Sequence, residues 1–354
     1  MNILILGGTG AMGVHLANIL SQQGHHVFVT SRSKHTDQAN IHFLQGDAHD
    51  PAFLQQCVKT NSFDAIVDFM IYSTAEFASR IDLLISSAKH YIFLSSARVY
   101  ADTQPVIRED SPRLLDTCTD KSYLSTDEYA LSKAREENLL YQSSHANWTI
   151  IRPYITYSEN RLQLGVLEKE NWLYRAIHGR TIVFSEDIAS KVTTLTYGYN
   201  VAQGIAAIIG KEEAWKQVFH ITADECLTWQ EIFELYLSVL ENKTGMKPKI
   251  MMIRQNPRVN MPYSKWQIVV DRYYNRRFDN TKINKFVDTK SFVKPKEGLK
   301  LCLEKFLEHP HFNAKGWSEH ALYDRIAGEW TPMSEIPTWK HRIKYLLRRT
   351  ILHK

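Results

Sequence analysis

Short apolar runs alternate with longer amphipathic segments along the first half of the chain. Six runs have the length and composition of buried strands: residues 2–6, 26–30, 41–44, 63–70, 91–94 and 148–151. Between them, apolar residues recur at helical spacing in four segments: 11–23, 51–59, 75–88 and 128–142. Strands that alternate with helices in this way predict an α/β fold, a doubly wound parallel sheet with helices on both faces.

The regular pattern ends near Pro153. Beyond it we expect one further helix, at residues 200–209, and one further strand, at residues 218–221. The segments around them are mixed and rich in Trp and Lys. We therefore expect a main domain and a smaller, discontinuous C-terminal lobe, with these bounds: residues 1–157 and 193–221 for the domain, residues 158–192 and 222–354 for the lobe.

The composition fits a folded protein without a membrane span. Apolar residues make up 44% of the chain and charged residues 23%, which supplies a sizeable core. No apolar run approaches the roughly 18 residues that cross a bilayer. No basic region precedes the first apolar run, so we expect no signal peptide. The four cysteines lie far apart without a Cys-x-x-Cys pair, which argues against a disulfide framework or zinc site and for the reducing cytoplasm.

The net charge of +5 comes from one end of the chain. Residues 338–354 contain six Lys and Arg and no Asp or Glu, which leaves the rest of the chain near neutral. We therefore expect no general nucleic-acid-binding surface. The segment Trp339–Arg349 mixes apolar and basic residues at helical spacing. It fits either a helix lying on an anionic membrane surface or a terminal helix packed on the body with a solvated basic face.

The first predicted strand runs directly into a glycine-rich turn and then into the first predicted helix. The turn reads Gly7-Gly8-Thr9-Gly10-Ala11-Met12-Gly13. Gly7 permits the tight turn, Gly10 lets backbone N–H groups approach a pyrophosphate, and Gly13 lets the helix pack closely. A purely structural turn is the alternative, because glycine is common wherever φ is positive. The position between a strand and a helix favours a dinucleotide site of the Rossmann type.

The end of the second predicted strand bears on the choice of cofactor. An NAD site usually carries an Asp or Glu there, whereas this chain has Ser31 and Arg32. Arg32 can pair with a 2′-phosphate and Ser31 can add a hydrogen bond, so we expect NADP in preference to NAD. After the third strand, Asp47 and Ala48 are expected beside the adenine, although Asp47 also fits a turn or a helix N-cap.

Three side chains predict a proton relay. Tyr129 and Lys133 lie one helical turn apart, and Ser96 follows the fifth predicted strand, whose carboxyl end is where ligands bind in a doubly wound sheet. A carbonyl/alcohol redox step moves a proton as a hydride moves. A free phenol is a poor base at neutral pH, and a neighbouring ammonium favours its ionised form. We therefore expect Tyr129 as acid or base, Lys133 as its support and Ser96 as the group that holds the substrate oxygen.

Together the motifs resemble the extended short-chain dehydrogenase/reductase family, in its nucleotide-sugar epimerase/dehydratase branch. The matching segments follow the order and spacing of the family: residues 7–13, 46–47, 94–100, 129–133 and 151–154. The resemblance implies that Ser96, Tyr129 and Lys133 are catalytic and that Tyr129 and Lys133 also contact the cofactor. It implies further that Pro153 lines the nicotinamide pocket. A homodimer through two packed helices is usual in this family.

Departures from the family pattern bear on the reaction. Dehydratases of the family carry an acidic residue or pair directly after the catalytic hydroxyl, where this chain has Ala97 and Arg98, so elimination lacks its acid and base. An NAD(P)-dependent 4-epimerase cycle or the reduction of a 4-ketosugar remains, and Arg32 favours reduction. The Gly-Pro that typically follows Tyr in the Arg-Pro motif of the family is missing after Tyr157, which leaves the substrate loop undefined.

A nucleotide sugar presents a diphosphate, which requires Arg or Lys in the C-terminal lobe. The candidates are Arg161, Arg175, Arg272 and Arg276, although a surface charge is the commoner role for any one of them. Tyr72, just after the fourth predicted strand, is expected either to face the sugar or to pack.

Two other interpretations stay open. One is a non-enzymatic member of the same fold, such as a dinucleotide-binding regulator or an RNA-associated protein. The complete set of Ser96, Tyr129 and Lys133 and the near-neutral body argue against it. The other is a reductase of a non-nucleotide carbonyl, which an apolar pocket without Arg would favour.

Overall fold

The computed structural model describes residues 1–262, 264–313 and 315–350, and the chain forms two compact units. Their bounds are residues 1–158, 194–226 and 276–295 for unit 1, and residues 159–193, 227–275 and 296–354 for unit 2. Apart from one-residue shifts at Ser158 and Thr193, the division differs from the expected one in two segments. Residues 222–226 and 276–295 belong to unit 1 rather than to the C-terminal lobe.

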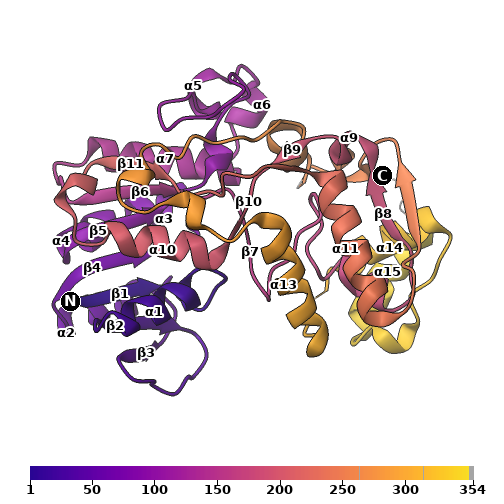
Figure 1. Cartoon of the computed structure of the whole chain (residues 1–354), viewed down its shortest axis with the longest axis horizontal. Coiled ribbons are helices and arrows are strands. Elements are labelled where there is room, and N and C mark those ends of the chain that lie inside the picture. The colour runs from indigo at the N-terminus through magenta and orange to yellow at the C-terminus, as the bar shows by residue number, and fades with distance from the viewer. Residues whose placement is uncertain (263, 314, 351–354) are drawn as a thin grey trace. The chain divides into compact units, whose positions relative to one another are not determined.

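Unit 1 is built on a parallel seven-stranded sheet (Figure 1). Its strands lie in the order β11-β6-β5-β4-β1-β2-β3, and every neighbouring pair is parallel. The bounds are β1 Asn2–Leu6, β2 His26–Ser31, β3 Ile41–Gln45, β4 Phe63–Asp68, β5 Ala88–Leu94, β6 Trp148–Arg152 and β11 Gln217–His220; a separate parallel pair is β7 Ile155–Tyr157 with β10 Leu195–Tyr197. The strand order reverses between β1 and β4, which in such a sheet is where ligands bind. The predicted doubly wound fold is confirmed.

Helices cover both faces of this sheet (Figure 1). Their bounds are α1 Gly13–Gln22, α2 Pro51–Thr60, α3 Thr74–Ala78, α4 Ile81–Ser86, α5 Leu114–Thr117, α6 Lys121–Leu124, α7 Tyr129–Gln142 and α10 Gly198–Ile208. On one face α1 and α10 bury Leu16 and Ile205 in a common apolar cluster. On the other face α2, α4 and α7 bury Leu54, Leu84 and Leu140 in a second cluster. Each such side chain contributes about 1.5–3 kcal/mol when it is fully buried, so the sheet is held from both sides.

The helix predicted at residues 75–88 is two short helices, α3 and α4. The carbonyl of Glu76 accepts hydrogen bonds from the Ser79 hydroxyl at 2.7 Å and from the Arg80 Nε at 3.1 Å. Helix α3 ends at Ala78, and these side-chain bonds satisfy the Glu76 carbonyl in its last turn.

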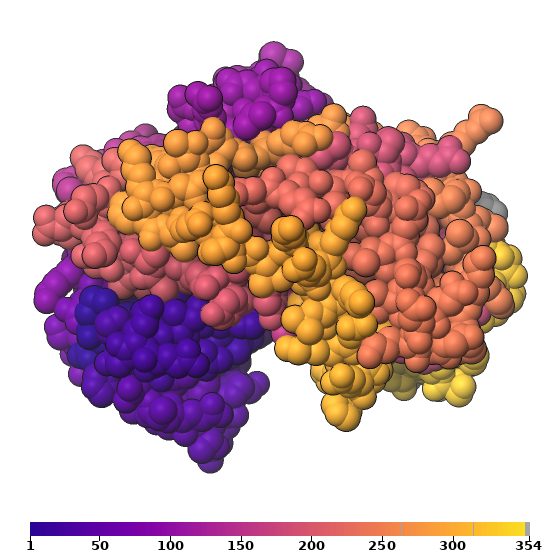
Figure 2. Space-filling model, in the orientation of Figure 1, coloured from indigo at the N-terminus to yellow at the C-terminus, as the bar shows by residue number. Residues whose placement is uncertain are grey.

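The segment 276–295 belongs to unit 1 because its backbone pairs with that unit. The Ile107 N–H donates to the Arg277 carbonyl at 2.8 Å, and the Asp279 N–H donates to the Ile107 carbonyl at 2.8 Å. Asn280 adds a side-chain bond to the Thr222 carbonyl, also at 2.8 Å. Figure 2 shows this segment, coloured orange, at the surface of unit 1.

Unit 2 consists of helices and two small strand pairs (Figure 1). The helices are α8 Trp172–Ile177, α9 Glu186–Ala189, α11 Trp229–Thr244, α12 Lys265–Gln267, α13 Pro295–Glu308, α14 Trp317–Ala327 and α15 Trp339–Thr350, with Pro295 the last residue of unit 1. The strand pairs are β8 Ile182–Ser185 with β13 Ile250–Ile253, parallel, and β9 Val192–Thr193 with β12 Leu227–Thr228, antiparallel. Helix α11 starts with a capping box of Thr228 and Glu231 and ends at Gly245 in the left-handed conformation, so both of its ends are satisfied locally.

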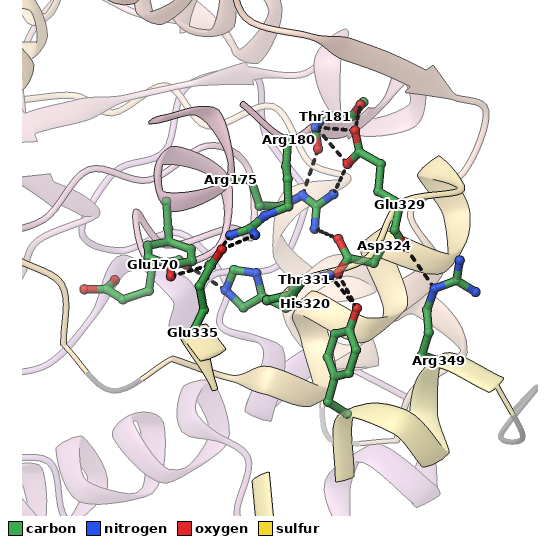
Figure 3. A network of polar contacts seen from close by, with 12 residues as sticks. Glu170, Arg175, Arg180, Thr181, His320, Asp324, Glu329, Thr331, Glu335 and Arg349 are labelled. Carbon is green, nitrogen blue, oxygen red and sulfur yellow. Dashed lines mark hydrogen bonds and ion pairs between the residues drawn. The ribbon is translucent and has the colours of Figure 1, made fainter. Parts of the chain in front are cut away.

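A buried polar network joins the helices of unit 2 (Figure 3). Asp324 of α14 accepts from the Arg175 Nη1 at 2.5 Å and from the Thr331 hydroxyl at 2.7 Å. Burial opposes ionisation of Asp324, but the hydrogen bonds and Arg175 outweigh it and hold the pKa of this carboxyl below its usual range. Arg180 forms a two-pronged pair with Glu335, at 3.0 and 2.9 Å. The network therefore holds α8 against α14 through Arg175 and Asp324, and it holds the segment after α8 to the segment after α14 through Arg180 and Glu335.

Candidate active site

A cavity of about 370 Å³ opens at the carboxyl ends of β1, β2, β3 and β4 in unit 1. Seven of the residues predicted to bind a cofactor line it: Gly7, Thr9, Gly10, Ser31, Arg32, Asp47 and Ala48. These residues come from three separate loops of the sequence. The cavity lies at the reversal of strand order, where a doubly wound sheet binds its ligand.

The glycine loop has the backbone that the sequence predicts. Gly7 has φ +68°, and its N–H donates to the Thr30 hydroxyl at 3.0 Å. A Cβ on Gly13 would lie 2.5 Å from the backbone of Gly8, so only glycine lets α1 start against the loop. A Cβ on Gly10 would meet no protein atom within 4 Å, so the space beside this residue is open.

The start of α1 suits an anion. Met12 occupies the N-cap position and makes no side-chain capping bond. Capping side chains normally occupy the first N–H groups of a helix. The Val14 N–H donates to the Gly10 carbonyl at 3.3 Å, and no capping side chain competes with an anion for the other N–H groups at the positive end of the helix dipole. Ala11 lies in the same turn. A Cβ on Gly198 would lie only 2.2 Å from the Ala11 carbonyl oxygen. The N-terminus of α10 is thereby packed directly against the loop.

The residues at the ends of β2 and β3 have different surroundings. Arg32 is exposed and lines the cavity. Ser31 is buried, and its hydroxyl accepts from the Ser33 N–H at 3.2 Å. Asp47 accepts from the His49 N–H at 3.0 Å, so it stabilises a turn. Among these predicted residues, Arg32 supplies a positive charge at the cavity and Asp47 stabilises the loop after β3.

Ser96 and Tyr129 lie at the ends of two packed elements. Ser96 follows β5 and caps a short 3₁₀ helix, Ala97–Val99, by accepting from the Arg98 N–H at 3.2 Å. Arg98 then forms an ion pair with Glu128 at 2.5 Å. Glu128 is the N-cap of α7, whose first residue is Tyr129. Arg98 also lies over the Tyr129 ring, 5.3 Å from its centroid, and so ties the Ser96 turn to the start of α7.

Lys133 is almost completely buried. Its Nζ lies 2.9 Å from the Glu136 Oε2 and 3.4 Å from the Met70 carbonyl, and it sits 4.4 Å from the centroid of the Phe93 ring. Met70 also lines the cavity of the glycine loop. The ammonium therefore has an internal counter-charge and lies next to the cavity wall. Glu136 is not among the site residues predicted from the sequence, although its position three residues after Lys133 on one helix was a signal.

Tyr72 packs in this same region rather than facing a sugar, which corrects one of the two roles expected for it. Tyr72 is buried, and its hydroxyl donates to both oxygens of Asp68, at 3.2 and 3.1 Å. The Tyr91 hydroxyl donates to Asp68 at 2.8 Å. Burial raises the pKa of Asp68, with Lys133 opposing the shift.

Arg152 of the Arg-Pro motif joins strand β6 to helix α7. Arg152 forms a two-pronged pair with Glu137 of α7, at 2.7 Å for each bond, and donates to the Tyr100 hydroxyl at 2.5 Å. The Tyr100 hydroxyl contacts the His220 Nε2 at 2.6 Å. Burial lowers the pKa of His220 to about 3, so this imidazole is neutral. Pro153 is buried after β6, and its carbonyl accepts from the Ala97 N–H at 2.9 Å.

Two predicted diphosphate ligands are wrong, because internal partners hold their guanidinium groups. Arg175 is buried and forms ion pairs with Asp324 and Glu329. Arg272 is buried, donates to the Gly165 carbonyl at 3.0 Å and pairs with Asp271. Removing either from these partners would leave a buried carboxylate without its counter-charge, which costs several kcal/mol.

The other two arginine candidates differ from each other. Arg276 is fully buried and donates to the Tyr100 carbonyl at 2.9 Å, so it too has a structural role. Arg161 is 43% exposed and lies 3.6 Å from Glu168. Only Arg161 therefore stays a candidate for an anionic ligand.

Residues 3–221, well over half of the chain, match the NAD dependent epimerase/dehydratase family. The chain belongs to this family. The matched region contains the seven-stranded sheet except Asn2, the first residue of β1, and also contains the glycine loop and the segment Tyr129–Gln142. The family resemblance that the motifs indicate is confirmed.

Two curated relatives that align with 72% and 66% of this chain have different names. The chloroplast stem-loop binding protein of 41 kDa b from Arabidopsis thaliana is 25% identical over 274 residues, 72% of this chain and 66% of that protein. The 2′-dehydrokanamycin reductase of Streptomyces kanamyceticus is 22% identical over 242 residues, 66% of this chain and 65% of that protein. This chain spans just under two thirds of the length of either relative.

Solved structures of the family share the fold. The UDP-glucose 4-epimerase of Bifidobacterium longum, solved with NAD+ and UDP, superposes with a TM-score of 0.66 at 17% identity. The superposition covers 88% of this chain and 99% of that one. Among the residues that the structure describes, no helix combines the length and apolar character of a membrane span, and no group of His, Cys, Asp and Glu is arranged to hold a metal ion.

Proposed function

We propose that the protein is an NAD(P)-dependent ketoreductase or epimerase of a nucleotide-activated sugar, with NADP as its preferred cofactor. Ser96, Tyr129 and Lys133 form its proton relay. The observation that carries the proposal is the contact of Lys133 with Met70, because Met70 lines the same cavity as the glycine loop. This contact supports a relay placed beside the cofactor.

The cavity suits a dinucleotide that carries an extra phosphate. The positive φ of Gly7 and the open space at Gly10 leave room for a pyrophosphate at the start of α1. Arg32 is the group for a 2′-phosphate, and residues 31–36 contain no carboxylate that would oppose it. Pro153 would line the nicotinamide side. When bound, the nicotinamide supplies or accepts the hydride at the reacting carbon of the sugar.

The residues of the chain handle the proton. Tyr129 would donate it to the carbonyl oxygen or accept it from the alcohol, while Ser96 hydrogen-bonds that oxygen. Lys133 supplies a positive charge that favours a phenolate, and Glu136 holds this charge in place. Arg98 adds a second cation near the Tyr129 ring.

Reduction is the direction that the chain favours. A reductase exchanges its cofactor at every turnover and commonly uses NADP, whereas an epimerase retains it and commonly uses NAD. The exposed Arg32 in the cavity therefore supports reduction. The similarity to 2′-dehydrokanamycin reductase agrees with this direction, and Arg161 is the candidate contact for an anionic substrate.

The test is Tyr129→Phe, assayed with NADPH or NADH against nucleotide ketosugars and with NADP+ or NAD+ against nucleotide sugars. Turnover should fall by about a hundredfold or more, as loss of a general acid usually causes, while the dissociation constant for the cofactor stays largely the same. Tyr199→Phe, which removes an exposed phenol of the same unit, is the control and should leave turnover intact. Equal turnover of Tyr129→Phe and the wild type would exclude the relay.

A second function rests on a different observation. The Lys133 ammonium already has a buried carboxylate partner, and the chloroplast relative of widest coverage is named for stem-loop binding. A non-catalytic, RNA-associated protein that binds a dinucleotide is therefore the alternative. Filter binding to a stem-loop RNA, with affinity falling steeply as salt rises, together with absent turnover on the whole sugar panel, would favour it.

A further inference from the structure

One side of helix α15 (Trp339–Thr350) packs on the rest of unit 2. Tyr345 is fully buried, and its hydroxyl donates to the Asp324 Oδ2 at 2.6 Å and accepts from the Thr331 N–H at 2.8 Å. Asp324 is in turn held by Arg175 (Figure 3). Tyr345 thus anchors the helix to the buried network.

The opposite side of α15 is apolar and exposed. Trp339, Ile343, Leu346 and Leu347 are between 40% and 66% exposed. At about 100° per residue these four positions form one stripe, and Ile343 lies on the far side of the helix from Tyr345. A folded protein ordinarily turns such a stripe inward, whereas here the inward position belongs to Tyr345.

Basic side chains border this stripe on both sides. Lys340 and Lys344 are exposed along one border. Along the other, the Arg342 Nε donates to the Ile336 carbonyl at 2.9 Å and the Arg349 Nε donates to the Glu329 carbonyl at 3.1 Å, the latter drawn in Figure 3. The sequence of α15 contains no Asp or Glu. The surface therefore combines an apolar centre with a purely cationic rim.

We propose that this face of α15 docks on an anionic lipid surface. The apolar stripe enters the headgroup region, and the basic rim contacts lipid phosphates. An RNA offers phosphates for the rim but no apolar partner for Ile343, Leu346 and Leu347. A second copy of the chain would bring two cationic rims together, which is unfavourable. Charge complementarity and the aliphatic centre both select the bilayer.

This surface lies in unit 2 and involves none of the residues of the cofactor cavity. Docking on lipid is therefore independent of the proposed redox function, and the loss of one leaves the other measurable.

The test is sedimentation of the full chain with phosphatidylcholine vesicles, with and without phosphatidylglycerol. The wild type should sediment with the anionic vesicles only. Ile343→Asp/Leu347→Asp should weaken this binding by about tenfold or more, because two aliphatic side chains no longer enter the lipid. Lys340→Glu/Lys344→Glu should weaken it in low salt, where surface charges act most strongly.

Leu301→Asp is the matched control, since Leu301 is 41% exposed on another helix of unit 2 and outside the stripe. It should bind like the wild type, and thermal melts should show that every variant is folded. Failure of the wild type to bind anionic vesicles, or equal binding of Ile343→Asp/Leu347→Asp, would overturn the proposal. A wild-type dimer in light scattering that becomes a monomer in Ile343→Asp/Leu347→Asp would overturn it in favour of self-association.

Discussion

Lys133 and Glu136 form an ion pair inside unit 1, with 2.9 Å between Nζ and Oε2 and with both side chains almost fully buried. Asp68 belongs to the same buried region, and burial raises the pKa of both carboxyl groups while Lys133 opposes each shift. Lys133 therefore stabilises the ionised forms of two buried acids. Glu136 in turn determines where the ammonium lies.

The first prediction concerns the stability that this pair confers. Glu136→Gln leaves a buried ammonium without its partner and should lower the free energy of unfolding by about 3–5 kcal/mol. Lys133→Met/Glu136→Leu removes both charges and should lose less free energy of unfolding than the single variants Lys133→Met and Glu136→Leu lose together. Urea unfolding followed by tryptophan fluorescence measures each value.

An exposed pair of the same unit provides the comparison. Lys89 lies 2.9 Å from Asp64 with its side chain 80% exposed, so Lys89→Ala should change the free energy by about 1 kcal/mol or less. If Glu136→Gln proved as mild as Lys89→Ala, the buried pair would not exist in solution.

The second prediction separates two glycines of one loop. Gly13→Ala should destabilise the fold, because its Cβ would lie 2.5 Å from the Gly8 backbone. Gly10→Ala should leave the melting temperature unchanged, since its Cβ meets no protein atom within 4 Å. It should nevertheless weaken dinucleotide binding about tenfold or more, because the methyl group occupies the space for the pyrophosphate. Thermal melts and cofactor titrations of both variants measure the two effects. An unchanged affinity of Gly10→Ala for the dinucleotide would place the cofactor elsewhere.

The parts of the fold that the sequence predicts depend on contacts near in sequence. Strand and helix periodicity, the Gly7 to Gly13 loop and the one-turn spacing of Tyr129 and Lys133 are all local features. The split at Ser79 is also local, but its signal is a side-chain bond to a carbonyl, which periodicity does not detect. The pattern thus identifies the sheet and most of its helices correctly.

The parts that the sequence does not predict depend on distant partners. Arg175 is a plausible diphosphate ligand by residue type, but Asp324, 149 positions away, takes its guanidinium. The backbone of Ile107 likewise pairs with a segment near Phe278 that looked like part of the other lobe. Residue type shows that a buried charge needs a partner, and only the tertiary fold shows which partner it has.

The third prediction tests the cofactor preference. Arg32→Ala should weaken NADP+ binding by about ten- to a hundredfold, the usual loss for a charge-assisted hydrogen bond, and leave NAD+ binding nearly unchanged. Lys34→Ala is the matched control, because Lys34 is an exposed cation of the same turn that does not line the cavity. Calorimetric titration gives, for each cofactor, the ratio between the dissociation constants of the variant and the wild type. Parallel losses for NADP+ and NAD+ would show that Arg32 does not recognise a 2′-phosphate.

The fourth prediction is that buried histidines make the fold sensitive to mild acid. His320 is buried on α14, and its pKa is lowered to about 3 by burial and by nearby Arg175 and Arg180. Its value in the unfolded chain is near the ordinary 6.5. Between these values the unfolded chain binds a proton that the folded chain does not, so stability falls as the pH falls. The loss is about 1.4 kcal/mol per pH unit below the unfolded value.

His320→Gln removes this titration while its amide can still donate to the Glu170 carbonyl, as the His320 Nε2 does at 3.0 Å. Between pH 7 and pH 5 the variant should therefore lose about 2 kcal/mol less stability than the wild type in urea unfolding. His309→Gln, at an exposed position of the same unit, should follow the wild-type curve. Equal acid sensitivity of His320→Gln and the wild type would mean that His320 is already accessible to protons in the folded protein.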